Sequence, residues 1–89
     1  MTTRRLLIRN EKGLHARASA RFVETVERFN AAARVERDGL VVSGDSIMGL
    51  MMLAAAQGSV IELTTSGEEA EALMEALDAL VADRFGEPR

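Results

Sequence analysis

Apolar residues are arranged in two different patterns along this chain. Short runs rich in Val, Ile and Leu lie between turn residues, which is typical of strands. In longer segments apolar residues recur every three or four positions, which is typical of helices. The patterns predict strands over residues 5–9, 34–37, 40–42 and 60–65, and helices over residues 16–29, 47–56 and about 70–81.

Turn and cap signals lie between these elements. The pair Asp38-Gly39 predicts a tight hairpin, because both central residues of a type I′ turn need positive φ. Residues 10–13 are predicted to form the turn after the first strand. Ser66 followed by Glu69 matches a capping box that would start the last helix. The tail over residues 86–89 is expected to fray.

The resulting order, β-α-β-β-α-β-α, predicts the α+β class. We expect a single domain over residues 1–89, with an antiparallel sheet covered by helices on one face and open to solvent on the other. The 47% of hydrophobic residues is ordinary for such a domain.

Composition argues against several functions. The chain has no cysteine and one histidine, so we expect no disulfide, no metal site and no cofactor. No apolar run reaches the roughly 20 residues of a membrane span, and no secretion signal is apparent, so we expect a cytoplasmic protein without membrane insertion. With three Phe, no Tyr, no Trp and a net charge of −3, the chain offers no stacking platform for nucleic acid.

Charge is unevenly distributed. Residues 1–44 contain nine Lys/Arg and five Asp/Glu, a net charge of +4, whereas residues 45–89 contain two and nine, a net charge of −7. The only histidine, His15, lies in the basic half, and this favours an anionic ligand there.

His15 stands at the predicted start of a helix, after Gly13. The first amides of that helix, those of Ala16, Arg17 and Ala18, have no intrahelical partner and attract anions. Imidazole is nucleophilic near neutral pH, and the Arg17 guanidinium could add a charge-assisted contact. This combination favours a histidine that carries a phosphoryl group.

A simpler interpretation of His15 stays open at this stage. A lone histidine can merely cap a helix or lie on the surface. No Asp or Glu is close to His15 in sequence to orient its ring, and no Ser/His/Asp arrangement suggests a hydrolase. A transfer site would therefore depend on groups supplied by a partner protein.

The segment over residues 47–53 is almost entirely apolar. Such a methionine-rich stripe is more often core than contact surface, but a short helix cannot bury every side. We expect Leu50 and Leu53 to be buried, and Met48 and Met51 to be exposed, because flexible thioethers suit surfaces that meet several partners.

Two motifs resemble those of a known family. The segment GLHAR at residues 13–17 resembles the active-site motif of the HPr family, the histidine-containing phosphocarriers of the bacterial phosphoenolpyruvate-dependent phosphotransferase system. The segment SIMGL at residues 46–50 resembles the second motif of that family. The length and element order also agree, so the resemblance covers nearly the whole chain.

The resemblance implies an open-faced β-sandwich, with a four-stranded antiparallel sheet and three helices on one face. It implies that His15 accepts a phosphoryl group from enzyme I on its δ1 nitrogen and passes it to an enzyme IIA-type acceptor. Arg17 would stabilise the phosphate. The chain would be a monomeric carrier with a transient phosphohistidine rather than an enzyme.

The second motif carries two further implications. The residues that would bind partner proteins beside His15 are Ala20, Ile47, Met48 and Met51. Ser46 would be the site of regulatory phosphorylation by an HPr serine kinase/phosphorylase. Alternatively, Ser46 or Asp45 simply caps the short helix.

The chain departs from the family pattern at three positions. Ala18 stands where a proline is common, and Glu24 and Glu27 stand where many sugar-pathway members have lysines. The chain could therefore belong to the nitrogen-type regulatory branch. A further alternative is an interaction module that acts mainly through binding by the Ile47/Met48/Met51 patch.

Overall fold

The computed structural model describes the whole chain, residues 1–89, and has the predicted order of elements. The strands are β1 (Thr2–Leu7), β2 (Ala32–Arg37), β3 (Leu40–Ser43) and β4 (Val60–Ser66), and the helices are α1 (Ala16–Glu27), α2 (Ile47–Met52) and α3 (Ala70–Ala82). A short 3-10 turn, η1 (Arg84–Gly86), follows α3.

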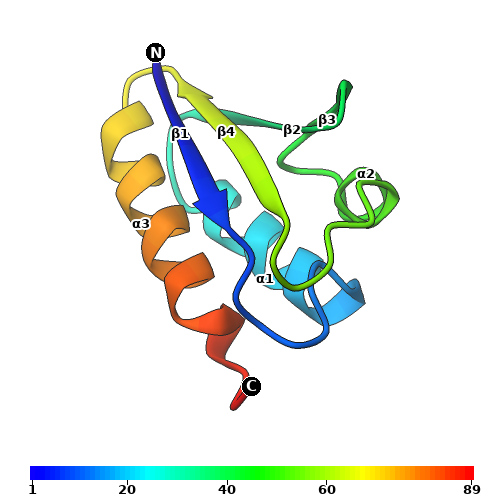
Figure 1. The fold of residues 1–89 in the computed structure, drawn as a ribbon. Coiled ribbons are helices and arrows are strands. Elements are labelled where there is room, and N and C mark those ends of the chain that lie inside the picture. The colour runs from blue at the N-terminus through cyan, green and yellow to red at the C-terminus, as the bar shows by residue number, and fades with distance from the viewer.

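The four strands form one antiparallel sheet in the order β1-β4-β2-β3. Helices α1 and α3 cover one face of this sheet, and α2 packs against α1 and β3 in the same layer (Figure 1). The fold is therefore the predicted α+β open-faced sandwich. No helix is long and apolar enough to span a bilayer.

The core lies between the sheet and the helix layer. Its fully buried side chains include Phe22 of α1, Ile61 and Leu63 of β4, and Leu73 and Leu77 of α3. The apolar stripes predicted for both long helices point into this layer, because residues three and four apart share one face of a helix. Leu50 and Leu53 are buried as expected.

The hairpin between β2 and β3 has the predicted geometry. Asp38 and Gly39 both have positive φ, at 52° and 83°, as a type I′ turn requires. The paired residues on either side are Arg37 and Leu40, so the turn sets the register of the two strands.

The predicted bounds of the first strand are wrong. β1 begins at Thr2 and ends at Leu7, whereas the short apolar run at residues 6–8 indicated a strand over residues 5–9. Residues 2–4, which the prediction left out, are polar. Arg4 nevertheless faces the helix layer, where its guanidinium donates to Glu75 at 2.7 Å and Asp78 at 2.9 Å on α3. An ion pair thus replaces the apolar contact that the pattern required.

Both earlier helices end sooner than predicted. α1 ends at Glu27, with Phe29 only partly buried beyond it. α2 ends at Met52 rather than residue 56, because Ala54 adopts a left-handed φ of 51° that interrupts the helix.

The capping box predicted before α3 is absent. Ser66 is the last residue of β4, and the N-cap of α3 is Glu69, which makes no side-chain capping bond. The Glu69 carboxylate instead accepts the backbone N–H of Asn30 at 2.6 Å. It thereby joins the start of α3 to the loop after α1.

The expectation of a frayed tail is also wrong. Three consecutive residues, Arg84, Phe85 and Gly86, have φ of 56°, 56° and 78°, and the chain turns sharply. The turn buries Phe85 completely in the core. The Arg89 carbonyl then accepts the Glu11 N–H at 3.0 Å, so the end of the chain packs against the loop before α1.

Candidate phosphoryl-transfer site

His15 is the N-cap of α1, with an extended backbone at φ −74° and ψ −179°. Its carbonyl accepts the Ser19 N–H at 2.9 Å, and its ring Nδ1 accepts the Arg17 N–H at 3.3 Å. The side chain remains 27% exposed. The histidine therefore caps the helix, as the simpler interpretation held, and still presents its ring to solvent.

The loop before His15 is held rigidly. Asn10 is fully buried, and its Nδ2 donates to the Gly13 carbonyl at 2.8 Å. Gly13 has a φ of +64°, and the next amide, that of Leu14, donates to the Ala55 carbonyl at 2.9 Å. The ring thus projects from a segment anchored to the connection between α2 and β4.

The first amides of α1 differ in accessibility. Ala16 and Arg17 are exposed, whereas Ala18 is fully buried. No hydrogen bond within the protein engages the N–H groups of Ala16 and Ala18. An anion bound outside the helix would therefore meet the amides of Ala16 and Arg17 more readily than that of Ala18.

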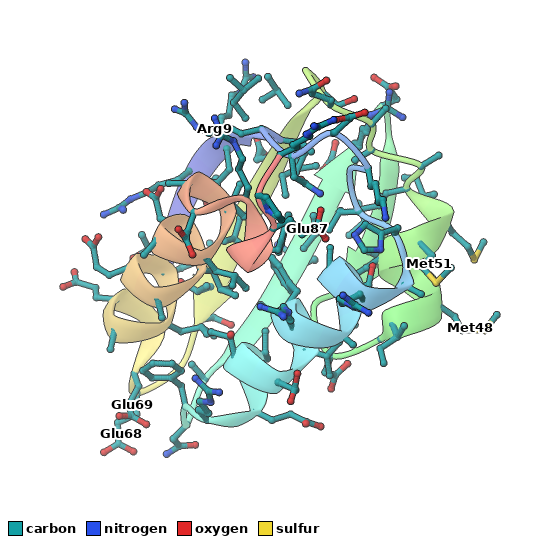
Figure 2. The ribbon with its side chains drawn as sticks, turned by 90° about the horizontal axis from the view of Figure 1, so that it is seen from below. Arg9, Met48, Met51, Glu68, Glu69 and Glu87 are labelled. Atoms are coloured by element: carbon teal, nitrogen blue, oxygen red, sulfur yellow. The ribbon has the colours of Figure 1, made fainter.

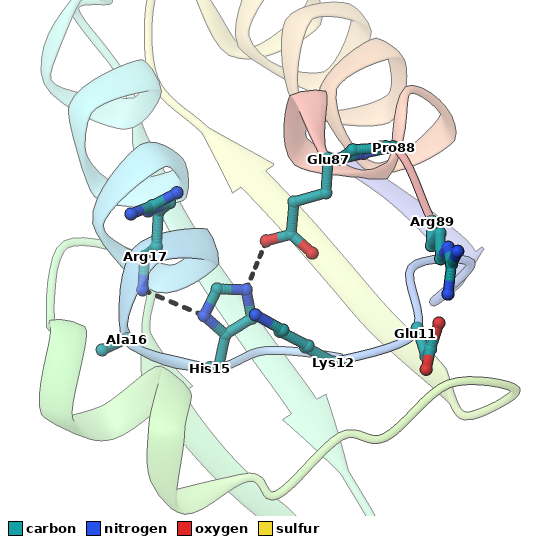
Figure 3. Close-up of a pocket in the computed structure, with 8 residues that line it drawn as sticks. All are labelled: Glu11, Lys12, His15, Ala16, Arg17, Glu87, Pro88 and Arg89. Carbon is teal, nitrogen blue, oxygen red and sulfur yellow. Dashed lines mark hydrogen bonds and ion pairs between the residues drawn. The ribbon is translucent and has the colours of Figure 1, made fainter.

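A hollow of about 600 Å³ lies beside the His15 ring (Figure 3). Its lining residues are Glu11, Lys12, His15, Ala16, Arg17, Glu87, Pro88 and Arg89. The three cations among them, Lys12, Arg17 and Arg89, come from both ends of the chain. Two carboxylates, those of Glu11 and Glu87, lie in the same lining, so the hollow presents both signs of charge beside the ring.

Glu87 is the residue of this site that sequence reasoning missed. Its carboxylate Oε2 pairs with His15 Nε2, and its Oε1 accepts a hydrogen bond from Asn10 Nδ2 at 3.0 Å (Figure 3). The side chain is only 14% exposed. A carboxylate therefore does pair with the ring, from 72 residues away in sequence, and the only advance signal was the apolar Phe85 just before the polar tail.

The surroundings of Glu87 favour its charged form. Burial alone would raise the pKa of this carboxyl group, but hydrogen bonds from Asn10 and His15, together with electrostatic attraction to His15 and Lys12, lower its pKa below the usual value. The carboxylate is therefore ionised whenever His15 is in use near neutral pH.

This lowered pKa gives the unfolding free energy a predictable pH dependence. As the pH falls, Glu87 is protonated in the unfolded chain near the usual pKa of 4.5, but in the folded protein only at lower pH. The stabilisation by Glu87 is therefore complete above pH 4.5 and decreases as the pH falls toward and below the folded-state pKa. We expect urea titrations to show a larger stability difference between the protein and Glu87→Gln at about pH 7 than at about pH 3. Equal differences at both pH values would contradict this assignment.

The second motif lies on α2, which packs against α1. Ile47 is 40% exposed, Met48 74% and Met51 44%, and both methionines point outward from α2 (Figure 2). The exposure expected for Met48 and Met51 is therefore confirmed. Ala20, on α1, is half-buried.

Ser46 is the N-cap of α2, and its Oγ accepts the Gly49 N–H at 2.9 Å. Asp45 instead pairs with the Ser43 hydroxyl at 2.6 Å. Of the two candidate caps, the structure therefore selects Ser46.

Ser46→Ala should lower the free energy of unfolding by about 1 kcal/mol, because the Gly49 amide loses its acceptor. Ser46→Asp should keep most of the stability, since a carboxylate can accept the same N–H. Chemical denaturation of the three proteins measures both effects. An alanine variant as stable as the parent would show that the cap contributes nothing.

The chain matches the family described as "PTS HPr component phosphorylation site" over residues 2–83. It therefore belongs to the HPr family of phosphocarrier proteins of the phosphotransferase system.

Similar proteins agree over the full length. The phosphocarrier protein HPr of Cupriavidus necator is 46% identical over 87 residues, 98% of each chain. The crystal structure of HPr from Thermoanaerobacter tengcongensis superposes with a TM-score of 0.95 at 39% identity and covers 100% of both chains. The structure of Bacillus subtilis Crh, described as a dimer with a swapped domain, has a TM-score of 0.76 at 37% identity and covers 94% of this chain and 97% of that one.

Proposed function

We propose that His15 accepts a phosphoryl group from enzyme I on Nδ1 and passes it to an enzyme IIA-type acceptor. The observation that supports this most is the placement of Nδ1 at the N-terminus of α1, beside the Arg17 amide and a hollow whose lining includes three cations and two carboxylates. The chain acts as a carrier, and catalysis of each transfer belongs to the partner proteins.

The transfer needs no cofactor. The Nδ1 lone pair forms a bond to phosphorus while the bond from phosphorus to the donor atom breaks, and that electron pair stays on the donor. The Arg17 N–H, which Nδ1 accepts in the resting protein, then turns to a phosphoryl oxygen. The N-terminal end of α1 and the side chains of Lys12, Arg17 and Arg89 stabilise the added negative charge.

We propose that partner proteins dock over the apolar patch formed by Ile47, Met48 and Met51, with Ala20 at its margin. Exposed apolar side chains beside a small charged hollow suit a surface that is covered only during transfer. Glu24 and Glu27 add negative charge to α1, so the partners would differ in charge from those of lysine-bearing family members. The difference in charge supports the alternative that this carrier belongs to the nitrogen-type regulatory branch and not to the sugar-uptake branch.

Regulation at Ser46 is a separate proposal. The hydroxyl that a serine kinase would modify is already the acceptor for the Gly49 N–H. A phosphate there would replace this bond and place negative charge next to the apolar docking patch, which would oppose burial of the patch by a partner.

A labelling reaction tests the proposed function. The purified protein is mixed with phosphoenolpyruvate and either a sugar-type or a nitrogen-type enzyme I, and the phosphosite is mapped under alkaline conditions that preserve phosphohistidine. We expect one phosphoryl group on His15 Nδ1 with at least one enzyme I. An unlabelled protein with both, or a label elsewhere, would refute the proposal, and the preferred enzyme I identifies the branch.

A second candidate function rests on the same exposed patch. If the protein is an interaction module, a partner binds through Ile47, Met48 and Met51 without phosphoryl chemistry. Binding would then be lost in the double variant Met48→Ala/Met51→Ala and unchanged in His15→Ala.

The expected monomeric state is tested separately, by sedimentation of the free protein.

A further inference from the structure

The His15 ring is bonded at both nitrogens, and the two bonds have opposite polarity. Nδ1 faces the Arg17 N–H, which can only donate, so Nδ1 must be the acceptor. Nε2 faces the Glu87 carboxylate, which when ionised can only accept, so Nε2 must hold the proton. The surroundings thus select the tautomer whose free lone pair is on Nδ1.

We infer that Glu87 is a positioning residue for phosphoryl transfer, which fixes His15 as the Nε2–H tautomer and directs the Nδ1 lone pair toward the incoming phosphorus. The inference rests on the proposed function and deepens it. A carboxylate that holds one ring nitrogen protonated while the other reacts performs the same task as the acid of a Ser-His-Asp triad.

The carboxylate is itself held in place. Its Oε1 accepts from Asn10 Nδ2, and the same Nδ2 donates to the Gly13 carbonyl. Asn10 is fully buried and Glu87 is only 14% exposed. The relay His15–Glu87–Asn10 therefore joins the ring to the rigid loop that precedes it, and Glu87 has little freedom to point elsewhere.

The backbone that delivers Glu87 is costly to form. Arg84 and Phe85 both have left-handed φ of 56°, which side chains with a Cβ rarely adopt. A Cβ on Gly86 would lie 2.5 Å from a guanidinium nitrogen of Arg21. Burial of Phe85 offsets this strain, and the turn places residue 87 against the ring.

The carboxylate has a defined part in the transfer step. As the Nδ1 lone pair forms the bond to phosphorus, positive charge develops on the ring, and the Glu87 carboxylate beside Nε2–H stabilises it. No proton moves: the Nε2 proton stays on the ring, and the electron pair of the broken bond stays on the donor. The same contact acts when the phosphoryl group leaves, because the reverse step passes through the same arrangement.

Two measurements test this role, and one of them needs no phosphoryl donor. Nitrogen-15 NMR of the neutral imidazole should show a protonated Nε2 with a proton protected from exchange with water, and an unprotonated Nδ1. Glu87→Gln should shift the ring toward a tautomer mixture, because an amide can both donate and accept. Glu11→Gln removes the same charge from the same hollow without a bond to His15 and should leave the tautomer unchanged.

In the labelling reaction, Glu87→Gln and Glu87→Ala should be phosphorylated to the same final extent as the parent but about ten-fold more slowly, since a charge-assisted hydrogen bond is lost. Phosphorylation of the Glu87 variants at the parent's rate would overturn the inference. An Nε2 proton that exchanges freely with water in the parent protein would also overturn it, and this result does not depend on whether a variant folds. A parent protein that accepts no phosphate would refute the proposed function instead, while the NMR result would still decide the tautomer.

Discussion

His15→Asn and His15→Ala should both lose all acid-labile phosphate in the labelling reaction. Neither side chain has a ring nitrogen that can form a bond to phosphorus. The measurement is radiolabel or mass increase at a point where the parent protein is fully labelled. This is the largest effect that we expect from any single substitution, because it removes the accepting atom itself.

The two variants control for each other. Asn is a good N-cap residue, and His15 caps α1 through its Nδ1. His15→Ala should therefore be less stable by about 1 kcal/mol, while His15→Asn should unfold close to the parent. Label on either variant would mean that another residue carries the phosphate, whatever its stability.

Gly13→Ala should destabilise the protein by about 3 kcal/mol, from overpacking added to a left-handed φ. A Cβ at this position would lie 2.3 Å from the Ala55 carbonyl oxygen and 2.9 Å from the Ala56 Cα. Both are backbone atoms, so neither can give way as a flexible side chain would. The Leu14–Ala55 hydrogen bond, which anchors the loop before His15, would be displaced.

Gly58→Ala is the matched control. Gly58 has a φ of +88°, but a Cβ there would meet nothing within 4 Å. It should therefore cost only the conformational penalty, about 1 kcal/mol. Thermal or urea unfolding compares the two, and a Gly13→Ala variant no less stable than Gly58→Ala would show that the close approach is tolerated.

The sequence predicted the order of elements because each core-facing stripe is continuous. Phe22, Val23 and Val26 share one face of α1. The two-residue turn at Asp38-Gly39 fixes the register of the strands that it joins. Element ends were less predictable. Arg4 lies on the inner face of β1 because α3 supplies two carboxylates, and no local pattern shows that.

Only those residues of the site that are neighbours in sequence could be predicted. His15, Arg17 and the first amides of α1 are neighbours in sequence, so the helix start could be inferred from residue type. Glu87 reaches the ring through tertiary packing of Phe85, and its role depends on a left-handed turn at non-glycine residues. Composition disfavours such a turn, which is why a packed segment was predicted to fray.

The contact between the last residues and the loop before α1 also bears on how the protein is handled. The carbonyl of Arg89 bonds to the Glu11 amide at the rim of the hollow, whereas Met1 is 90% exposed at the other end of the molecule (Figure 1). An affinity tag or fluorophore attached after Arg89 would crowd the ring and its partners. One attached before Met1 would leave them clear, so the choice of terminus decides whether a labelled protein reports the native chemistry.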